Sequence, residues 1–290
     1  MNLKWLLMAC IALVLAACTS APVRDDSTDA IPASTELLEA FVTALPGRFR
    51  SATRLDDPEP GVLMLTDLRA VDDSAIALEF IQPRDDDNRG FVLVLERHSI
   101  GPFIAGQFVP VQADGTLSTR TCPMRFRLLQ GLLSGETDPV TCRFGSAENS
   151  VGLLKEVALT VDQIVIADRL TGPGRRSNES PDVLRLHRLV RFRGNVRVRD
   201  NEIGSAWRMA EPVELEAGMP AAEPVDASGM GLDVGVAMRL VEGQAAGQPL
   251  LYLQIDEVLS GKVIGQAWAD AQAGRIGLAL DRIQIDLIRQ

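Results

Sequence analysis

Hydrophobic positions follow a helical spacing only near the start of the chain. Residues 34–45 carry apolar side chains three and four positions apart, and Pro46-Gly47 stops the pattern. Ser34 or Thr35 is suited to cap this segment, because a hydroxyl oxygen accepts hydrogen bonds from the free amides of a first helical turn. The spacing therefore predicts one helix, whose apolar face is made of Leu37, Leu38, Phe41 and Leu45.

From residue 61 onward, apolar and polar positions alternate, with turn residues about every eight to twelve positions. Such alternation is typical of antiparallel sheets that bury one face. We therefore predict an all-β protein, in which an antiparallel barrel is followed by a C-terminal β extension. The expected strands are 61–68, 74–82, 91–98, 103–111, 122–130, 152–159, 161–169, a pair within 183–199, 231–241, 249–259, 262–269 and 276–289 with a bulge near 281–282.

The segment 183–199 has the clearest two-faced pattern. Even positions are mostly apolar and odd positions mostly basic, and Gly194-Asn195 is suited to a turn between two short strands. If the basic face lined the barrel, its charges would need an anionic ligand, because unpaired buried charge is costly. We expect the face to point outward, where it pairs with acidic residues or contacts anionic lipid headgroups. The candidate ligand-binding residues are Arg185, Arg191, Arg193 and Arg197.

The first residues have the form of an export signal. Lys4 precedes an apolar run over 5–17, and small residues end the run. The exit Leu15-Ala16-Ala17-Cys18 resembles the lipobox of bacterial lipoproteins. The resemblance implies that Cys18 receives a diacylglycerol, is released by the lipoprotein signal peptidase and is then acylated on its amine, with palmitate as an example. The alternatives are an ordinary signal peptide and a short anchor helix.

The residues after the lipobox bear on the destination of the protein. Thr19 stands where an aspartate would resemble an inner-membrane retention signal, so we expect an outer-membrane protein that faces the periplasm. Acyl chains on Cys18 would hold it there without a membrane-spanning segment. Residues 18–33 are small, polar and acidic, and predict a disordered tether.

Four cysteines occur in the chain. Cys10 would leave with the signal and Cys18 would carry lipid, so Cys122 and Cys142 remain. In an oxidising compartment, such a pair is most simply a disulfide, and two buried free thiols are the alternative. We expect no metal there, because no second cysteine pair or histidine accompanies them.

Charge and motif content exclude several functions. The net charge of −10 argues against a nucleic-acid partner, although bases outnumber acids over 88–199. The chain has two histidines, and it carries no nucleophile elbow, phosphate loop or zinc-protease motif. Glu96 and His98 are weak candidates for acid–base catalysis, because charged residues at a strand end are more often solvated. We expect no cofactor and no enzyme activity.

Several short segments occur in a familiar order. They are Leu45-Pro46-Gly47-Arg48-Phe49-Arg50-Ser51 after the helix, the strand 91–97, Cys122-Pro123-Met124-Arg125-Phe126, Ser134-Gly135-Glu136-Thr137, Cys142-Arg143, and 159–162 leading to Asp168-Arg169. Over about 38–193 this order resembles the CpcT/CpeT family of phycobiliprotein chromophore lyases. The resemblance implies a calycin-like barrel whose cavity holds an open-chain tetrapyrrole. The lipobox, the C-terminal extension and the few aromatic residues depart from that family, so the fold transfers more readily than the chemistry.

The sequence thus predicts a signal peptide over 1–17, a tether over 18–33, a CpcT/CpeT-like barrel over 34–204 and a C-terminal β extension over 205–290. The leading hypothesis is a lipid-anchored lipoprotein that binds a small amphipathic or anionic ligand and is not an enzyme. One alternative is an envelope assembly or scaffold lipoprotein that binds a protein partner. The other is an enzyme similar to a chromophore lyase.

Overall fold

The computed structural model describes residues 35–57, 61–83, 89–98, 103–146, 150–172, 182–199, 205–243 and 248–290. The chain divides into two units, Met1–Pro32 and Ala33–Gln290, and all described residues belong to the second. The predicted signal peptide, Cys18 and the tether therefore lie outside the described residues.

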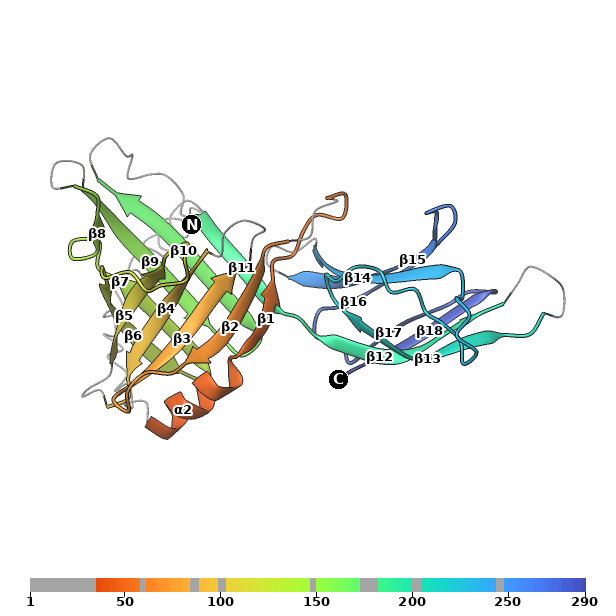
Figure 1. Ribbon diagram of the computed structural model, residues 1–290, viewed down its shortest axis with the longest axis horizontal. Helices are drawn as coiled ribbons and strands as arrows, with labels where there is room; N and C mark the ends of the chain where they lie inside the picture. The colour runs from red at the N-terminus through yellow and green to blue at the C-terminus, as the bar shows by residue number, and fades with distance from the viewer. Residues whose placement is uncertain are drawn as a thin grey trace, which may run out of the picture. The chain divides into compact units, whose positions relative to one another are not determined.

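One helix, α2 (Thr35–Ala44), precedes the strands, as the spacing predicts. Its buried side chains are Leu38, Phe41 and Val42, whereas Leu37, which we expected on the apolar face, is exposed. Val42 occupies the buried face in its place, because the face that meets the barrel is rotated from the one predicted. The helix lies across one end of the barrel (Figure 1).

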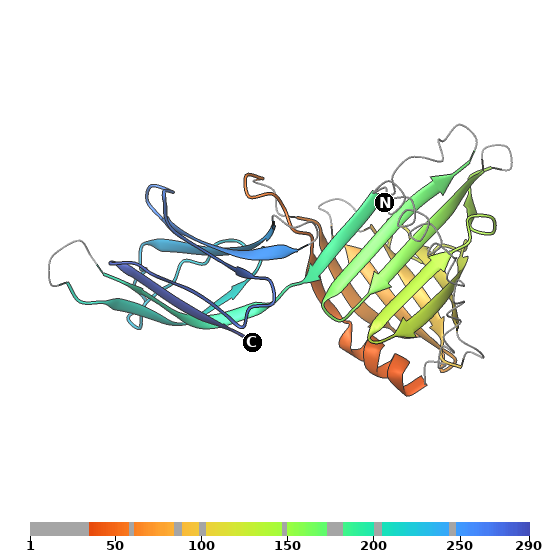
Figure 2. The ribbon, with the colours of Figure 1, turned by 180° about the vertical axis from the view of Figure 1, so that it is seen from behind.

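Ten antiparallel strands form a closed barrel. They are β1 (Gly47–Arg50), β2 (Leu63–Arg69), β3 (Ala75–Gln82), β4 (Arg89–Glu96), β5 (Ile104–Val111), β6 (Cys122–Leu129), β7 (Leu132–Thr137), β9 (Val151–Leu159), β10 (Gln163–Thr171) and β11 (Asp182–Arg188). Each pairs with its neighbour along the chain, apart from the two-residue β8 (Arg143–Phe144), which adds to β9. Closure comes from β11, which pairs with both β10 and β1, so the barrel has no open edge. Figure 2 shows the wall of green strands that includes β10 and β11.

The barrel interior is a continuous hydrophobic core. Alternate residues of the strands point inward and meet the buried face of α2. The disulfide Cys122–Cys142 confirms the predicted pairing and joins β6 to the segment before β8, with the two Cα atoms 4.8 Å apart. Large side chains that are almost fully buried include Phe49, Phe80, Leu93, Phe126 and Leu159.

The remaining strands form two further sheets that share a second core. A four-stranded sheet has the order β13-β12-β18-β17, and a three-stranded sheet has the order β14-β15-β16. The strands are β12 (Arg191–Val198), β13 (Arg208–Glu216), β14 (Val234–Glu242), β15 (Pro249–Glu257), β16 (Val263–Asp270), β17 (Arg275–Ala279) and β18 (Ile283–Arg289). Buried residues of both sheets belong to one cluster, so the sheets are two layers of a sandwich (Figure 1).

Two local predictions need correction. The strand pair within 183–199 breaks at 189–190, and Gly194 marks a register shift within β12 rather than a turn. The two strands also enter different sheets, because β12 pairs with β13 and β18. At the C-terminus, the expected bulge near 281–282 is the turn of a hairpin between β17 and β18. The predicted domain boundary at residue 204 stays a prediction, although sheet pairing changes after Arg188.

Candidate functional site

The four predicted arginines lie on two different surfaces. Arg185 is on the outer face of barrel strand β11, where it is paired in register with Val165 of β10. Arg191, Arg193 and Arg197 are exposed on the outer face of β12, while Phe192 and Val196 of the same strand fill the sandwich core. The basic face therefore points outward, as we expected. The alternation extends across a chain segment that crosses from one sheet to another, so the structure does not bring all four together.

The arginines of β12 meet acidic residues or further polar residues. The Nε atom of Arg191 lies 3.8 Å from a carboxylate oxygen of Glu216. Arg197 lines a shallow surface hollow together with the ion pair between Arg275 and Asp286, whose atoms are 2.6 Å apart. This surface resembles an ordinary solvated sheet face more than a ligand site.

Glu96 and His98 are exposed at the end of β4 and just beyond it. The backbone of the intervening Arg97 accepts a hydrogen bond from the hydroxyl of Thr35 on α2. None of the hollows described here within the ordered part of the chain includes Glu96 or His98. Their location is that of a strand end near a helix, and catalysis at these residues stays a prediction.

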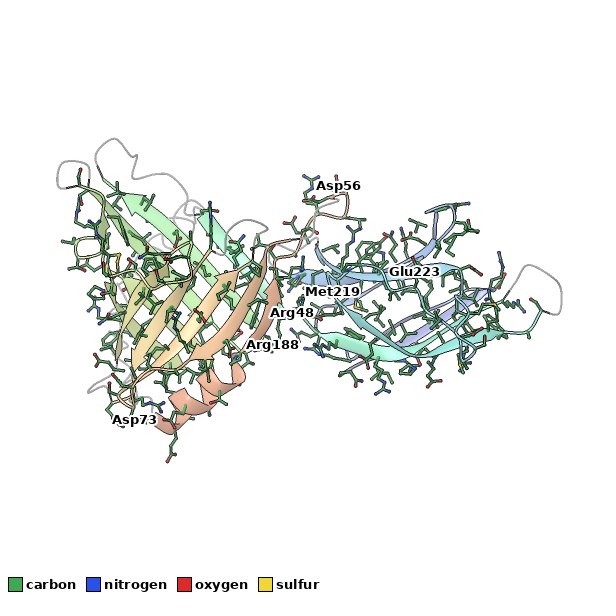
Figure 3. All side chains as sticks on the ribbon, in the orientation of Figure 1. Arg48, Asp56, Asp73, Arg188, Met219 and Glu223 are labelled. Atoms are coloured by element: carbon green, nitrogen blue, oxygen red, sulfur yellow. A yellow bond between two sulfur atoms is a disulfide. The ribbon has the colours of Figure 1, made fainter. Side chains whose placement is uncertain are left out.

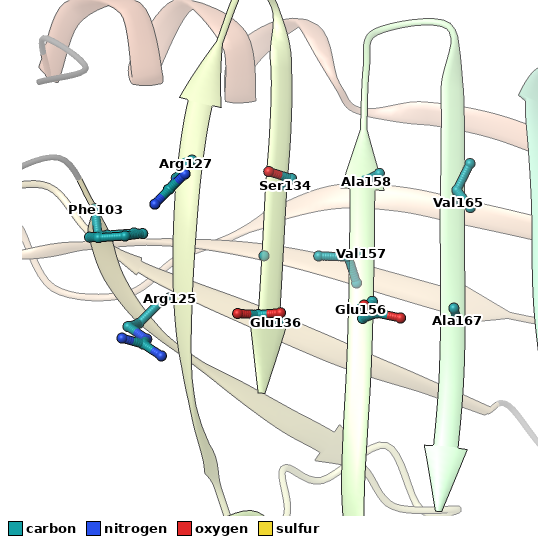
Figure 4. A pocket seen from close by; sticks show the side chains of 11 residues that line it. Phe103, Arg125, Arg127, Ser134, Glu136, Glu156, Val157, Ala158, Val165 and Ala167 are labelled. Carbon is teal, nitrogen blue, oxygen red and sulfur yellow. The ribbon is translucent and has the colours of Figure 1, made fainter. Parts of the chain in front are cut away.

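A hollow of about 670 Å³ lies on the outer wall of the barrel (Figure 4). Its floor consists of small residues on three neighbouring strands, so the wall is recessed between longer side chains. Ser134 on β7 pairs in register with Ala158 on β9, which pairs with Val165 on β10. Ala167, one row further along β10, also lines the floor.

One side of this barrel-wall hollow is basic and aromatic. Arg125 and Arg127 project outward from β6, with their guanidinium carbons 5.8 and 4.3 Å from the ring centre of Phe103. Within the described residues, neither arginine is in an ion pair. A guanidinium stacked on a ring keeps its edge donors available for an oxyanion.

The same hollow also contains two carboxylates. Glu136 on β7 and Glu156 on β9 face each other in register, and Arg125 stands opposite Glu136 on its other side. Like charges directly across a strand pair are unfavourable. The site therefore offers positive charge at the Arg127 side and negative charge along the next row.

The sequence signal for Arg125 and Arg127 was present but was used only to predict a strand. In Cys122-Pro123-Met124-Arg125-Phe126-Arg127, apolar and basic residues alternate, which places both arginines on the outer face. The small residues that recess the floor are separated along the chain by turns. Only the register of β7, β9 and β10 brings them together.

A second hollow, of about 450 Å³, includes Arg185 and His187 of β11. Burial, and then the charge of Arg185, lower the pKa of the His187 imidazole. His187 is therefore neutral at pH 7 while Arg185 carries the positive charge. The described part of the chain gives Arg185 no ion pair either.

One charged pair lies inside the barrel. The Nζ atom of Lys155 on β9 donates to both carboxylate oxygens of Asp168 on β10, at 2.6 and 2.8 Å. The ammonium also lies 5.0 and 4.9 Å from the ring centres of Phe91 and Phe108. Burial lowers the pKa of Lys155, and the Asp168 carboxylate opposes this effect.

No family model, curated protein or solved structure matches the chain. No helix among the described residues is long and apolar enough to cross a membrane. The fold and the hollows are therefore the basis for the function that we propose below.

Proposed function

We propose that the protein is a non-enzymatic, lipid-anchored envelope protein that binds a small amphipathic ligand carrying a carboxylate or phosphate group. The observation that carries this proposal is the barrel-wall hollow, which combines a floor of small side chains with two arginines that have no acidic partner in the described chain.

The two sides of the hollow suit the two parts of such a ligand. Arg127, with its ring contact to Phe103, would hold the anionic group, because a fixed guanidinium forms bidentate bonds to carboxylate and phosphate. The apolar part of the ligand would cover Ala158, Val165 and Ala167. A ligand with a cationic group beside the anionic one would in addition meet Glu156.

The proposal places the ligand on the wall of the barrel rather than in its centre. Side chains of α2 and of the barrel strands pack into a continuous core, and the hollows described here are bounded by outward-facing residues. The calycin-like ancestry suggested by the resemblance to CpcT/CpeT lyases would then account for the barrel, while the tetrapyrrole chemistry of that family need not follow. The lipobox motif supports the envelope location.

The decisive experiment is native mass spectrometry of the chain purified from its own host, before and after mild denaturation. We expect a small-molecule mass that is released on unfolding. The double variant Arg125→Met with Arg127→Met should lose most of this mass, and Arg169→Met, an exposed arginine on the neighbouring β10, should retain it.

Two outcomes would contradict the proposal. Wild-type protein without any bound mass, even after incubation with lipid extract, would remove the support for a carrier. Equal retention of ligand in the double variant would place the ligand elsewhere. Crosslinking to one envelope protein in the absence of a small ligand would favour the scaffold alternative.

A further inference from the structure

Arg50 is a buried cation outside the barrel-wall hollow. It ends strand β1, next to Phe49, whose side chain points into the barrel, so the Arg50 side chain lies on the outer face. Only 8% of Arg50 is exposed. A guanidinium buried to this extent is costly unless its charge and its donors are matched.

The donors of Arg50 are incompletely used. Its Nη1 atom donates to the carbonyl oxygen of Gly61 at 3.1 Å. Its Nε atom is buried and has no hydrogen-bond partner, and it is the one buried side-chain nitrogen or oxygen in this condition among the described residues. Gly218, at φ 81°, packs so closely that an added Cβ would lie 2.7 Å from this Nε atom. The backbone is thus shaped to the guanidinium without accepting from it.

Arg50 opens onto a hollow of about 370 Å³ that contains a second arginine. Arg239 of β14 donates to the carbonyl oxygens of Asp57 and Leu55, at 3.2 and 3.3 Å, and lies 5.4 Å from the ring centre of Tyr252. These acceptors are neutral, so they hold the position of Arg239 without cancelling its charge. The rest of the lining is small or apolar: Ser51, Thr53, Gly61, Gly218, Met219, Pro220, Ala237 and Leu240.

The nearest carboxylate is already committed to other arginines. Glu216 lies 3.0 Å from Nη1 of Arg48 and 3.8 Å from Nε of Arg191. The second Nη atom of Arg48 donates to the sulfur of Met219 at 3.2 Å, and Figure 3 labels both residues. The charge of Glu216 attracts Arg50, and that of Arg48 repels it. Positive charge therefore exceeds negative charge around the hollow.

We propose that this hollow is a binding site for a small oxyanion, a carboxylate or a phosphate, held between Arg50 and Arg239. The oxyanion supplies the missing negative charge, and two fixed guanidinium groups present more than one donor to it. The site goes beyond the proposed function, because it shares no lining residue with the barrel-wall hollow and would exist if that hollow were empty.

Isothermal titration calorimetry with the full chain tests the site, using inorganic phosphate in one series and acetate in the other, with ionic strength held constant by chloride. We expect saturable binding of at least one anion. Arg50→Met should weaken binding at least about tenfold, because hydrogen bonds to a charged group contribute about 1.5–3 kcal/mol. Arg50→Lys, which keeps the charge but not the two-pronged donor, should weaken binding less.

Matched variants keep the result interpretable. Arg239→Met should also weaken binding, and it replaces a residue that is not on the barrel, so it serves if Arg50→Met does not fold. Arg169→Met should bind like wild type, and so should the double variant of Arg125 and Arg127, which separates this site from the barrel-wall hollow. Absence of saturable binding of both anions to wild type would overturn the proposal. Unchanged affinity in folded Arg50→Met or Arg239→Met would overturn it as well.

Discussion

The buried Lys155–Asp168 pair predicts a marked difference between two single substitutions. The Lys155 side chain is 6% exposed, and that of Asp168 is 44% exposed. Asp168→Asn leaves an ammonium inside the barrel without its counter-charge, whereas Lys155→Met removes the charge and keeps a long apolar side chain among aromatic rings.

The expected magnitudes follow from this burial. Removal of one partner from a fully buried pair costs about 3–5 kcal/mol of stability. Because Asp168 is partly in water, its contribution is screened, and we expect Asp168→Asn to lower the free energy of unfolding by about 2 kcal/mol. Lys155→Met should change it by less than about 1 kcal/mol, since a well-packed apolar replacement avoids desolvation of the ion.

The pH dependence provides an independent check. Burial lowers the pKa of Lys155 and Asp168 raises it, so the pKa falls further in Asp168→Asn. The unfolded chain then binds more protons than the folded chain between the lowered pKa and about 10.4, and stability rises with pH across this interval. The deficit of Asp168→Asn should therefore shrink between pH 7 and pH 10.

Urea unfolding, followed by circular dichroism, measures both effects, and the double variant completes the cycle. The double variant should be close in stability to Lys155→Met, because asparagine then faces no charge. A result in which Lys155→Met loses more than Asp168→Asn would refute the reasoning. So would a deficit of Asp168→Asn that grows as the pH rises.

Three further predictions concern the disulfide, a histidine and a glycine. Substitution of both Cys122 and Cys142 by alanine should lower the unfolding free energy by about 3 kcal/mol, because the bond closes a loop with a separation of 20 residues; guanidinium titration checks this value. His187 has a lowered pKa in the fold, so acidification below about pH 6.5 should destabilise the protein as the unfolded state takes up the proton; His187→Asn should flatten the unfolding free energy between pH 7.5 and 5.5. Gly218→Ala should cost at least about 2 kcal/mol, from positive φ and a close contact with a guanidinium, whereas Gly131→Ala, with a similar φ of 78° and nothing within 4 Å, should cost only about 1 kcal/mol; equal losses in thermal melts would contradict this account.

Periodicity was sufficient to predict the class of fold and most of its elements. Helix α2, the alternating strands and the disulfide were all expected from local pattern and from the cysteine count. The sites where the prediction was wrong are those decided by tertiary pairing. Leu37 fits the helical spacing as well as Val42 does, and only the barrel end determines which of the two is buried.

The candidate site shows the same limit. The alternation of 183–199 correctly predicts that Arg185 and Arg193 share a parity, but a chain crossing at 189–190 sends them to different sheets. The floor of the barrel-wall hollow requires the registers of three strands, and the excess charge around Arg50 depends on Arg239, which is distant in sequence. No local pattern contains this information.

Arg188 has a consequence for the time course of folding. It is the last residue of the last barrel strand, and its guanidinium donates to the carbonyl oxygens of Ala44, Leu45 and Pro46 at the end of α2, across sequence separations of 142–144 residues. Positive charge at this end of a helix is favourable. During synthesis, the helix is made long before the residue that caps it.

The pairing of β1 with β11 has the same long separation. Until Arg188 emerges, a growing chain therefore has an incomplete barrel with an unpaired edge at β1 and an uncovered apolar face on α2. Such non-local closure is typical of slow folding, and the intermediates expose surfaces that aggregate. The residue that completes the barrel thus also sets the length of time during which the nascent protein depends on protection by other proteins.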